Sequence, residues 1–151
     1  MFGRPLALIF SGAHMTQPRQ PDQNPGTSKD SDSSLYHRIG GYDVIAAAID
    51  GMLMRMRADP QFARFATGRS EDSHRRARQF LVDQLCALAG GPCFYTGRDM
   101  KTSHKGLGIT ESDWEALIKY MQGSMAELNI PQREQDEVIT LWTSYKSEIV
   151  E

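Results

Sequence analysis

The chain has 151 residues, of which 40% are apolar and 24% are charged, and its formal net charge is −2. This length fits one domain with a single core, and the composition is typical of globular proteins. The near-neutral charge offers no basic surface for nucleic acid or anionic lipid, and no apolar run approaches the ~18 residues that cross a bilayer. We therefore expect neither a nucleic-acid nor a membrane partner.

The first 33 residues differ in composition from the rest of the chain. Positions 16–34 hold no aliphatic or aromatic side chain and include three prolines. Such a segment cannot bury enough apolar surface to offset the entropy of ordering it. We predict a disordered N-terminal extension over 1–33 and one folded domain over 34–151. The apolar stretch 5–10 is too short for a secretory signal, and Met15 is an alternative start.

Helical periodicity begins after the glycine pair at 40–41. Apolar side chains recur there at helical spacing up to residue 56, and Asp59–Pro60 ends the helix because proline disfavours a helical residue before it. A second long helix is predicted over 71–88 and is ended by Gly-Gly-Pro at 90–92.

The stretch 93–108 is rich in glycine and leaves room for a helix only around 99–105. Thr110 and Asp113 have the spacing of a capping box, so a further helix is predicted to begin there. Pro131 is expected in the first turn of a last helix, whose apolar stripe continues nearly to the end of the chain. No segment alternates with period two, and the predicted fold class is therefore all-α.

Cys86 and Cys93 lie seven positions apart. This spacing matches no zinc motif, and two cysteines do not make a disulfide framework. A reducing, cytoplasmic location is the simplest interpretation.

Among the four histidines, His104 has the most suggestive setting. It follows the short predicted helix and precedes Leu107, Ile109 and the helix that contains Trp114. A single imidazole among large apolar side chains suits a haem iron, which takes one neutral nitrogen while the other is held by a hydrogen bond. The spacing alone also fits an ordinary half-buried core histidine, and such a histidine is the more common case. A Ser103–His104–acid triad is disfavoured, because neighbouring helical residues point about 100° apart.

Four blocks, in this order and spacing, resemble the group I truncated haemoglobins. They are Ser34-Leu35-Tyr36-x-Arg38-Ile39-Gly40-Gly41, Ala58-Asp59-Pro60, Gly90-Gly91-Pro92-x-x-Tyr95-Thr96-Gly97-Arg98-Asp99-Met100 and His104-x-Gly106-Leu107-Gly108-Ile109-Thr110. The likeness runs from about residue 34 to 150. Its most specific part is the stretch from 90 to 110, which contains the histidine.

The resemblance implies a shortened globin, built as a two-over-two helical sandwich with a vestigial first helix, that binds haem b. The family's proximal histidine, which ligates the iron, falls on His104. Lys101 lies near the haem edge, where it either pairs with a propionate or is simply exposed. The positions implied to line the haem are Phe65, Leu81, Leu85, Tyr95, Met100, Lys101, Leu107, Ile109 and Trp114.

The distal side departs from the family. Leu53 stands where many members have a tyrosine that hydrogen-bonds oxygen. Counting back from the second glycine pair places Ala77 and Leu81 at distal positions, and Gln84 alone is polar on that face. Gln84 either donates into the pocket, or it points to solvent or caps a backbone carbonyl. The register is open, because this helix differs in length from that of well-known members. A shift would bring His74 toward the iron; otherwise His74 is exposed.

Three functions follow from these observations. Reversible binding of a diatomic gas (oxygen, NO or CO) is the favoured one, since loss of the distal tyrosine should speed oxygen escape. The alternative is an NO dioxygenase that works with a separate reductase. The third is a structural helical domain without haem, against which the intact block around His104 argues. We expect a monomer or weak dimer.

Overall fold

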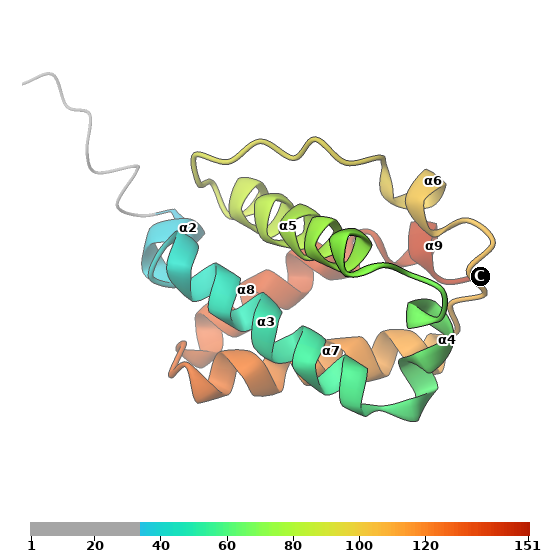
Figure 1. Cartoon of the computed structure of the whole chain (residues 1–151). Helices are drawn as coiled ribbons and strands as arrows, with labels where there is room; N and C mark the ends of the chain where they lie inside the picture. Colours follow the sequence, from blue (N-terminus) through green and yellow to red (C-terminus); the bar gives the residue numbers. More distant parts are fainter. Residues whose placement is uncertain (1–33) are drawn as a thin grey trace, which may run out of the picture.

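Residues 34–151 are described by the structure, a computed structural model, and they form helices joined by turns (Figure 1). The predicted disordered extension over 1–33 lies outside the described residues. In chain order the elements are α2 (Leu35–Arg38), α3 (Tyr42–Ala58), η1 (Pro60–Phe62), α4 (Ala63–Ala66), α5 (Glu71–Leu88), α6 (Met100–His104), α7 (Glu111–Glu127), α8 (Gln132–Thr143) and α9 (Lys146–Ile149). No strand occurs in this part of the chain, which confirms the all-α class. None of these helices is long and apolar enough to cross a membrane.

Side-chain caps explain where α5 and α7 begin. The Ser70 hydroxyl accepts a hydrogen bond from the Ser73 N–H at 3.2 Å, at the start of α5. At the start of α7 both bonds of the predicted capping box are present: the Asp113 N–H donates to Thr110 Oγ1, and the Thr110 N–H donates to the Asp113 carboxylate. Such caps satisfy N–H groups that a first helical turn leaves without partners. Both helices therefore begin where the sequence predicts.

The centre of the core lies where α3 meets its neighbours. α3 packs against α5 and α7, and α7 packs against α8, as expected for a two-over-two helical sandwich (Figure 1). Ser124 Oγ donates to the Ala48 carbonyl at 2.8 Å, and a methyl group on Gly51 would lie 2.1 Å from that Oγ. Gly51 therefore permits the close approach of α3 and α7. The most deeply buried apolar side chains are Ile45, Ile49, Met52, Val82, Leu85, Met121, Met125 and Val138.

The last predicted helix is divided in two. The sequence predicts an apolar stripe that continues to Ile149, but α8 ends at Thr143 and α9 begins at Lys146. The hydroxyls of Thr143 and Ser144 donate to carbonyl groups of the preceding turn at 2.7 and 2.6 Å. Such bonds compete with the backbone ladder, and two of them in succession lie where α8 ends. Pro131 is the N-cap residue of α8, which begins at Gln132, so it does not lie in the first turn as predicted.

Cys86 and Cys93 form a disulfide, which the spacing of the two cysteines did not predict. Their Cα atoms are 5.8 Å apart, inside the range of roughly 4.4–6.8 Å that disulfides span. The chain turns back at the end of α5, where the Gly91 N–H donates to the Cys86 carbonyl at 2.8 Å. The turn places Cys93 over the last turn of α5, so the cysteines no longer indicate a reducing compartment.

Removal of this disulfide is expected to lower the free energy of unfolding by about 2–3 kcal/mol, because the cross-link restricts the unfolded chain. Urea unfolding of the Cys86→Ala/Cys93→Ala variant measures the effect. Dithiothreitol should destabilise the wild-type chain by a similar amount and leave the double variant unchanged. Equal stability of the oxidised and reduced wild-type chain would contradict this expectation.

Candidate functional site

His104 is the last residue of α6, and the elements around it fix its position. Asp99 caps α6 by accepting a hydrogen bond from the Thr102 N–H at 2.8 Å, and this bond lowers the pKa of the Asp99 carboxyl. Met100, at the first position of α6, is buried, whereas the next three residues are exposed. α6 also packs against α9 (Figure 1). The helix is therefore held at its start and by a neighbouring helix.

The backbone selects one tautomer of the His104 imidazole. Its Nδ1 lies 2.8 Å from the Met100 carbonyl oxygen, one helical turn earlier. A carbonyl oxygen only accepts, so Nδ1 carries the ring proton and donates it, which leaves the lone pair on Nε2. No hydrogen bond to Nε2 forms within residues 34–151. Histidines that ligate metals are arranged in this way, with the second ring nitrogen held by a hydrogen bond.

Ser103 lies closer to His104 than the sequence predicts. Ser103 Oγ is 3.0 Å from His104 Nδ1, because both side chains lean toward the preceding turn of α6. The hydroxyl proton nevertheless has backbone acceptors, the Asp99 carbonyl at 2.9 Å and the Met100 carbonyl at 3.2 Å. No carboxylate hydrogen-bonds to His104 in the described part of the chain. The contact therefore supports the orientation of the imidazole and does not assemble a Ser–His–acid triad.

Gln84 links α5 to the helix that carries His104. Its side chain is buried, and Nε2 lies 3.2 Å from Met100 Sδ. The alternative in which Gln84 points to solvent is therefore wrong. Met100 contacts Gln84 through its sulfur and His104 through its carbonyl oxygen, so one residue connects α5 with the imidazole.

The family model of the bacterial-like globins matches residues 34–151, which is the whole described part of the chain. The chain belongs to this family. Globins are haem proteins, so membership indicates a haem-based function.

Individual relatives confirm the resemblance of this globin to the group I truncated haemoglobins. The group 1 truncated hemoglobin of Mycolicibacterium paratuberculosis is 29% identical over 107 residues, 71% of this chain and 76% of the relative. The fold matches the truncated hemoglobin of Tetrahymena pyriformis with a TM-score of 0.71 at 22% identity, over 78% and 97% of the two chains. The 2/2 hemoglobin of Synechococcus sp., solved with covalently attached heme, gives a TM-score of 0.64 at 26% identity, over 72% and 89%.

The residues of this globin predicted to line the haem differ in how far their side chains are buried. The rings of Tyr95 and Phe80 form an edge-to-face pair with their centroids 6.1 Å apart, and the Tyr95 hydroxyl donates to the Arg98 carbonyl at 2.6 Å. Burial raises the pKa of Tyr95. The segment between α5 and α6 thus returns along α5 to α6, the helix that ends at His104 (Figure 1). Leu85, Met100 and Trp114 are buried, Phe65, Leu81, Tyr95 and Ile109 are partly buried, and Lys101 and Leu107 are exposed.

Of the predicted distal residues, Leu53 alone lines the cavity between α3 and α5. Leu53, Ala77 and Leu81 are partly buried, and Gln84 is buried. This cavity has a volume of about 380 Å³ and is lined by Asp50, Leu53, Met54, Arg57, His74, Arg75 and Arg78. His74 is half-buried in this cavity rather than exposed, and its Nδ1 lies 3.9 Å from the Glu71 carboxylate.

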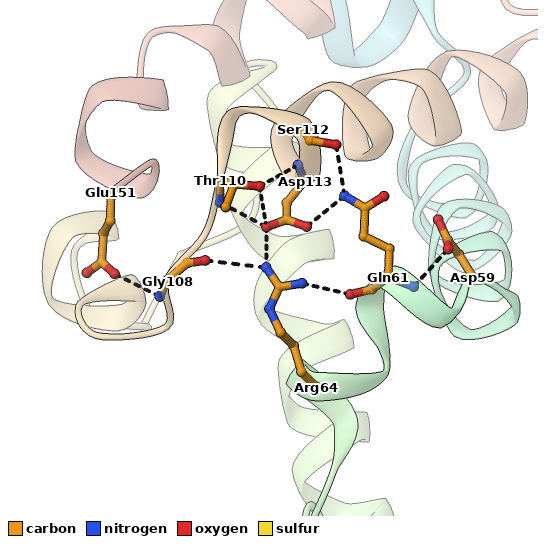
Figure 2. A network of polar contacts seen from close by, with 8 residues as sticks. All are labelled: Asp59, Gln61, Arg64, Gly108, Thr110, Ser112, Asp113 and Glu151. Carbon is orange, nitrogen blue, oxygen red and sulfur yellow. Dashed lines mark hydrogen bonds and ion pairs between the residues drawn. The ribbon is translucent and has the colours of Figure 1, made fainter.

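A polar network holds the start of α7, beyond the loop that follows His104 (Figure 2). The Asp113 carboxylate accepts hydrogen bonds from the Thr110 N–H and from Gln61 Nε2, each at 2.8 Å, and it pairs with Arg64. Burial alone would raise the pKa of Asp113, but these hydrogen bonds outweigh burial and hold it well below its usual range. The network therefore joins η1 and α4 to the start of α7.

Proposed function

We propose that this globin binds haem b with His104 Nε2 as the proximal iron ligand, and that it binds a diatomic gas: oxygen, NO or CO. The hydrogen bond from His104 Nδ1 to the Met100 carbonyl carries this proposal, because it leaves the Nε2 lone pair for a metal. Haem supplies the iron to which such gases bind. The sequence contains no C-x-x-C-H motif, so a non-covalent haem b is the proposed form.

Haem titration of the purified full-length chain tests this proposal. We expect saturable uptake of one haem per chain and a ferrous form whose Soret band shifts on addition of CO. Absence of saturable uptake would overturn the proposal and favour the haem-free structural domain.

Gln84 is the residue we propose as hydrogen-bond donor to the gas. The donor can come neither from Leu53, which replaces the tyrosine of the family, nor from the apolar side chains of Ala77 and Leu81. Gln84 is buried, and an amide NH₂ group has two N–H donors. The contact with Met100 Sδ uses one of them, which leaves the other for a ligand.

Replacing Gln84 with leucine is therefore expected to raise the oxygen dissociation rate about tenfold, equivalent to ~1.4 kcal/mol. The CO dissociation rate should change far less, because bound CO carries little charge. Stopped-flow measurements on both ligands give the two rates. Gln122→Leu, at an exposed glutamine of α7, is the matched control. Small and equal effects of Gln84→Leu on oxygen and CO would place Gln84 outside the pocket.

An NO dioxygenase that works with a separate reductase is the alternative function. The chain carries no flavin or nicotinamide motif, so repeated turnover would need electrons from a partner. Nitrate formed from the oxygen-loaded protein, NO and a reducing system separates the two functions. We expect at most one nitrate per haem for a gas-binding protein, whereas many nitrates per haem would support the enzyme.

The cytoplasmic location and the monomeric or weakly dimeric state stay predictions. The Cys86–Cys93 disulfide removes the argument from cysteine usage on which the location rests. Cell fractionation and light scattering of the purified chain test the two predictions separately.

A further inference from the structure

In the loop between His104 and α7, the backbone N–H groups of Gly106 and Gly108 point toward one acceptor. Gly106 and Gly108 have φ values of +77° and +60°, in the left-handed region that glycine adopts without steric cost. Successive N–H groups in such a conformation form a concave site for an anion. The Leu107 N–H donates to the His104 carbonyl at 3.1 Å, so this loop is joined directly to the end of α6.

The side chain of Glu151 occupies this concave site. Its Oε1 accepts from the Gly106 N–H at 2.6 Å, and its Oε2 accepts from the Gly108 N–H at 2.7 Å. The two bonds lower the pKa of the Glu151 carboxyl because they favour its ionised form. The backbone N–H of Glu151 also donates to the Ile109 carbonyl at 2.9 Å. One residue therefore makes three hydrogen bonds to the segment that follows His104.

The same loop is held from its other side by Arg64 of α4. The Arg64 guanidinium donates to the Gly108 carbonyl at 3.3 Å and pairs with Asp113 (Figure 2). The N–H and the carbonyl of Gly108 are thus both engaged, by Glu151 and by Arg64. Leu107 and Ile109, which are predicted to line the haem, flank this fixed peptide.

We propose that Glu151 is a positioning residue for the proximal site. Its carboxylate fixes residues 106–109, and through the bond between Leu107 and the His104 carbonyl it sets the orientation of the imidazole and the depth of Leu107 and Ile109 against the haem. This inference rests on the proposed function, in which His104 ligates the iron.

The test compares Glu151→Ala with Glu148→Ala in the haem-loaded full chain. Glu148 is an exposed glutamate of α9 whose side chain makes no hydrogen bond within residues 34–151, so its variant is the matched control. The first readout is amide hydrogen exchange at Gly106 and Gly108 by NMR. In Glu151→Ala both amides should exchange about tenfold faster, the factor expected for loss of a charge-assisted hydrogen bond.

The second readout is the iron–histidine stretching band of the ferrous protein in resonance Raman spectra, together with the rate of haem transfer to apomyoglobin. A shifted or broadened band and faster haem loss in Glu151→Ala, with Glu148→Ala like the wild type, support positioning through His104. Unchanged amide exchange would show that the Glu151 carboxylate does not hold the loop, and would overturn the proposal. Faster exchange with an unchanged band and unchanged haem loss reduces Glu151 to a structural contact and overturns the positioning role. A wild-type chain without an iron–histidine band refutes the proposed function. The exchange data would still show whether Glu151 holds the loop.

Discussion

Replacing His104 with alanine is expected to remove iron ligation, and with it the normal Soret band of the ferrous–CO form. The reason is structural: within the described residues, His104 is the imidazole whose Nδ1 is held by a backbone carbonyl while Nε2 stays open. His37 lies in α2 with its Nδ1 2.7 Å from Ser34 Oγ, and His74 lies in the cavity between α3 and α5. Within residues 34–151, neither imidazole is held by a backbone carbonyl as His104 is.

Absorption spectra of His104→Ala and of the control His74→Ala measure this effect, and far-UV circular dichroism verifies that both variants fold. The control should keep the wild-type spectrum. An unchanged ferrous–CO spectrum in a folded His104→Ala variant would mean that another group ligates the iron.

Replacing Asp113 with alanine is expected to lower the free energy of unfolding by about 3 kcal/mol, as is typical when one partner of a buried charged network is removed. The Asp113 side chain is 3% exposed. Its loss leaves the Thr110 N–H without its acceptor, whereas Gln61 Nε2 keeps Ser112 Oγ at 3.2 Å and Arg64, at 45% exposure, can turn to water. Urea unfolding measures the loss. The control Glu115→Ala, at an exposed site on α7, should change stability by less than about 0.5 kcal/mol.

The same carboxylate predicts a pH dependence. The pKa of Asp113 is lower in the folded than in the unfolded chain, so its contribution is complete above the unfolded value of about 4 and is lost as the pH falls below it. Wild-type stability should therefore decline more steeply from pH 5 to pH 3 than the stability of Asp113→Ala. Parallel declines of the two proteins would show that Asp113 makes no such contribution.

The long helices could be predicted from the sequence because their ends depend on neighbouring residues. Ser70 begins α5, and the Thr110–Asp113 capping box begins α7. The short helices η1 and α4 were missed, since three or four residues cannot display a helical period, and α2 was expected only as the vestigial first helix that the family resemblance implies. The break between α8 and α9 was also missed, because hydroxyl groups that bond to the preceding turn leave the apolar spacing intact.

The candidate site could be predicted only in part, and for a different reason. Its centre, His104, came from the resemblance to a family rather than from spacing. The contacts that orient the site join residues far apart in the chain: Gln84 with Met100, and Glu151 with Gly106 at a separation of 45 residues. No local pattern encodes such pairs. The buried Nε1 of Trp142, which has no hydrogen-bond partner within the described residues, likewise becomes visible only in the folded chain.

The central claim is that His104 Nε2 binds the haem iron, and resonance Raman spectroscopy of the ferrous, ligand-free protein tests it most directly. The account predicts an iron–histidine stretching band in the wild type, its loss in His104→Gly, and its return when free imidazole is added to that variant. An iron–histidine band that persists in His104→Gly without imidazole would contradict the account.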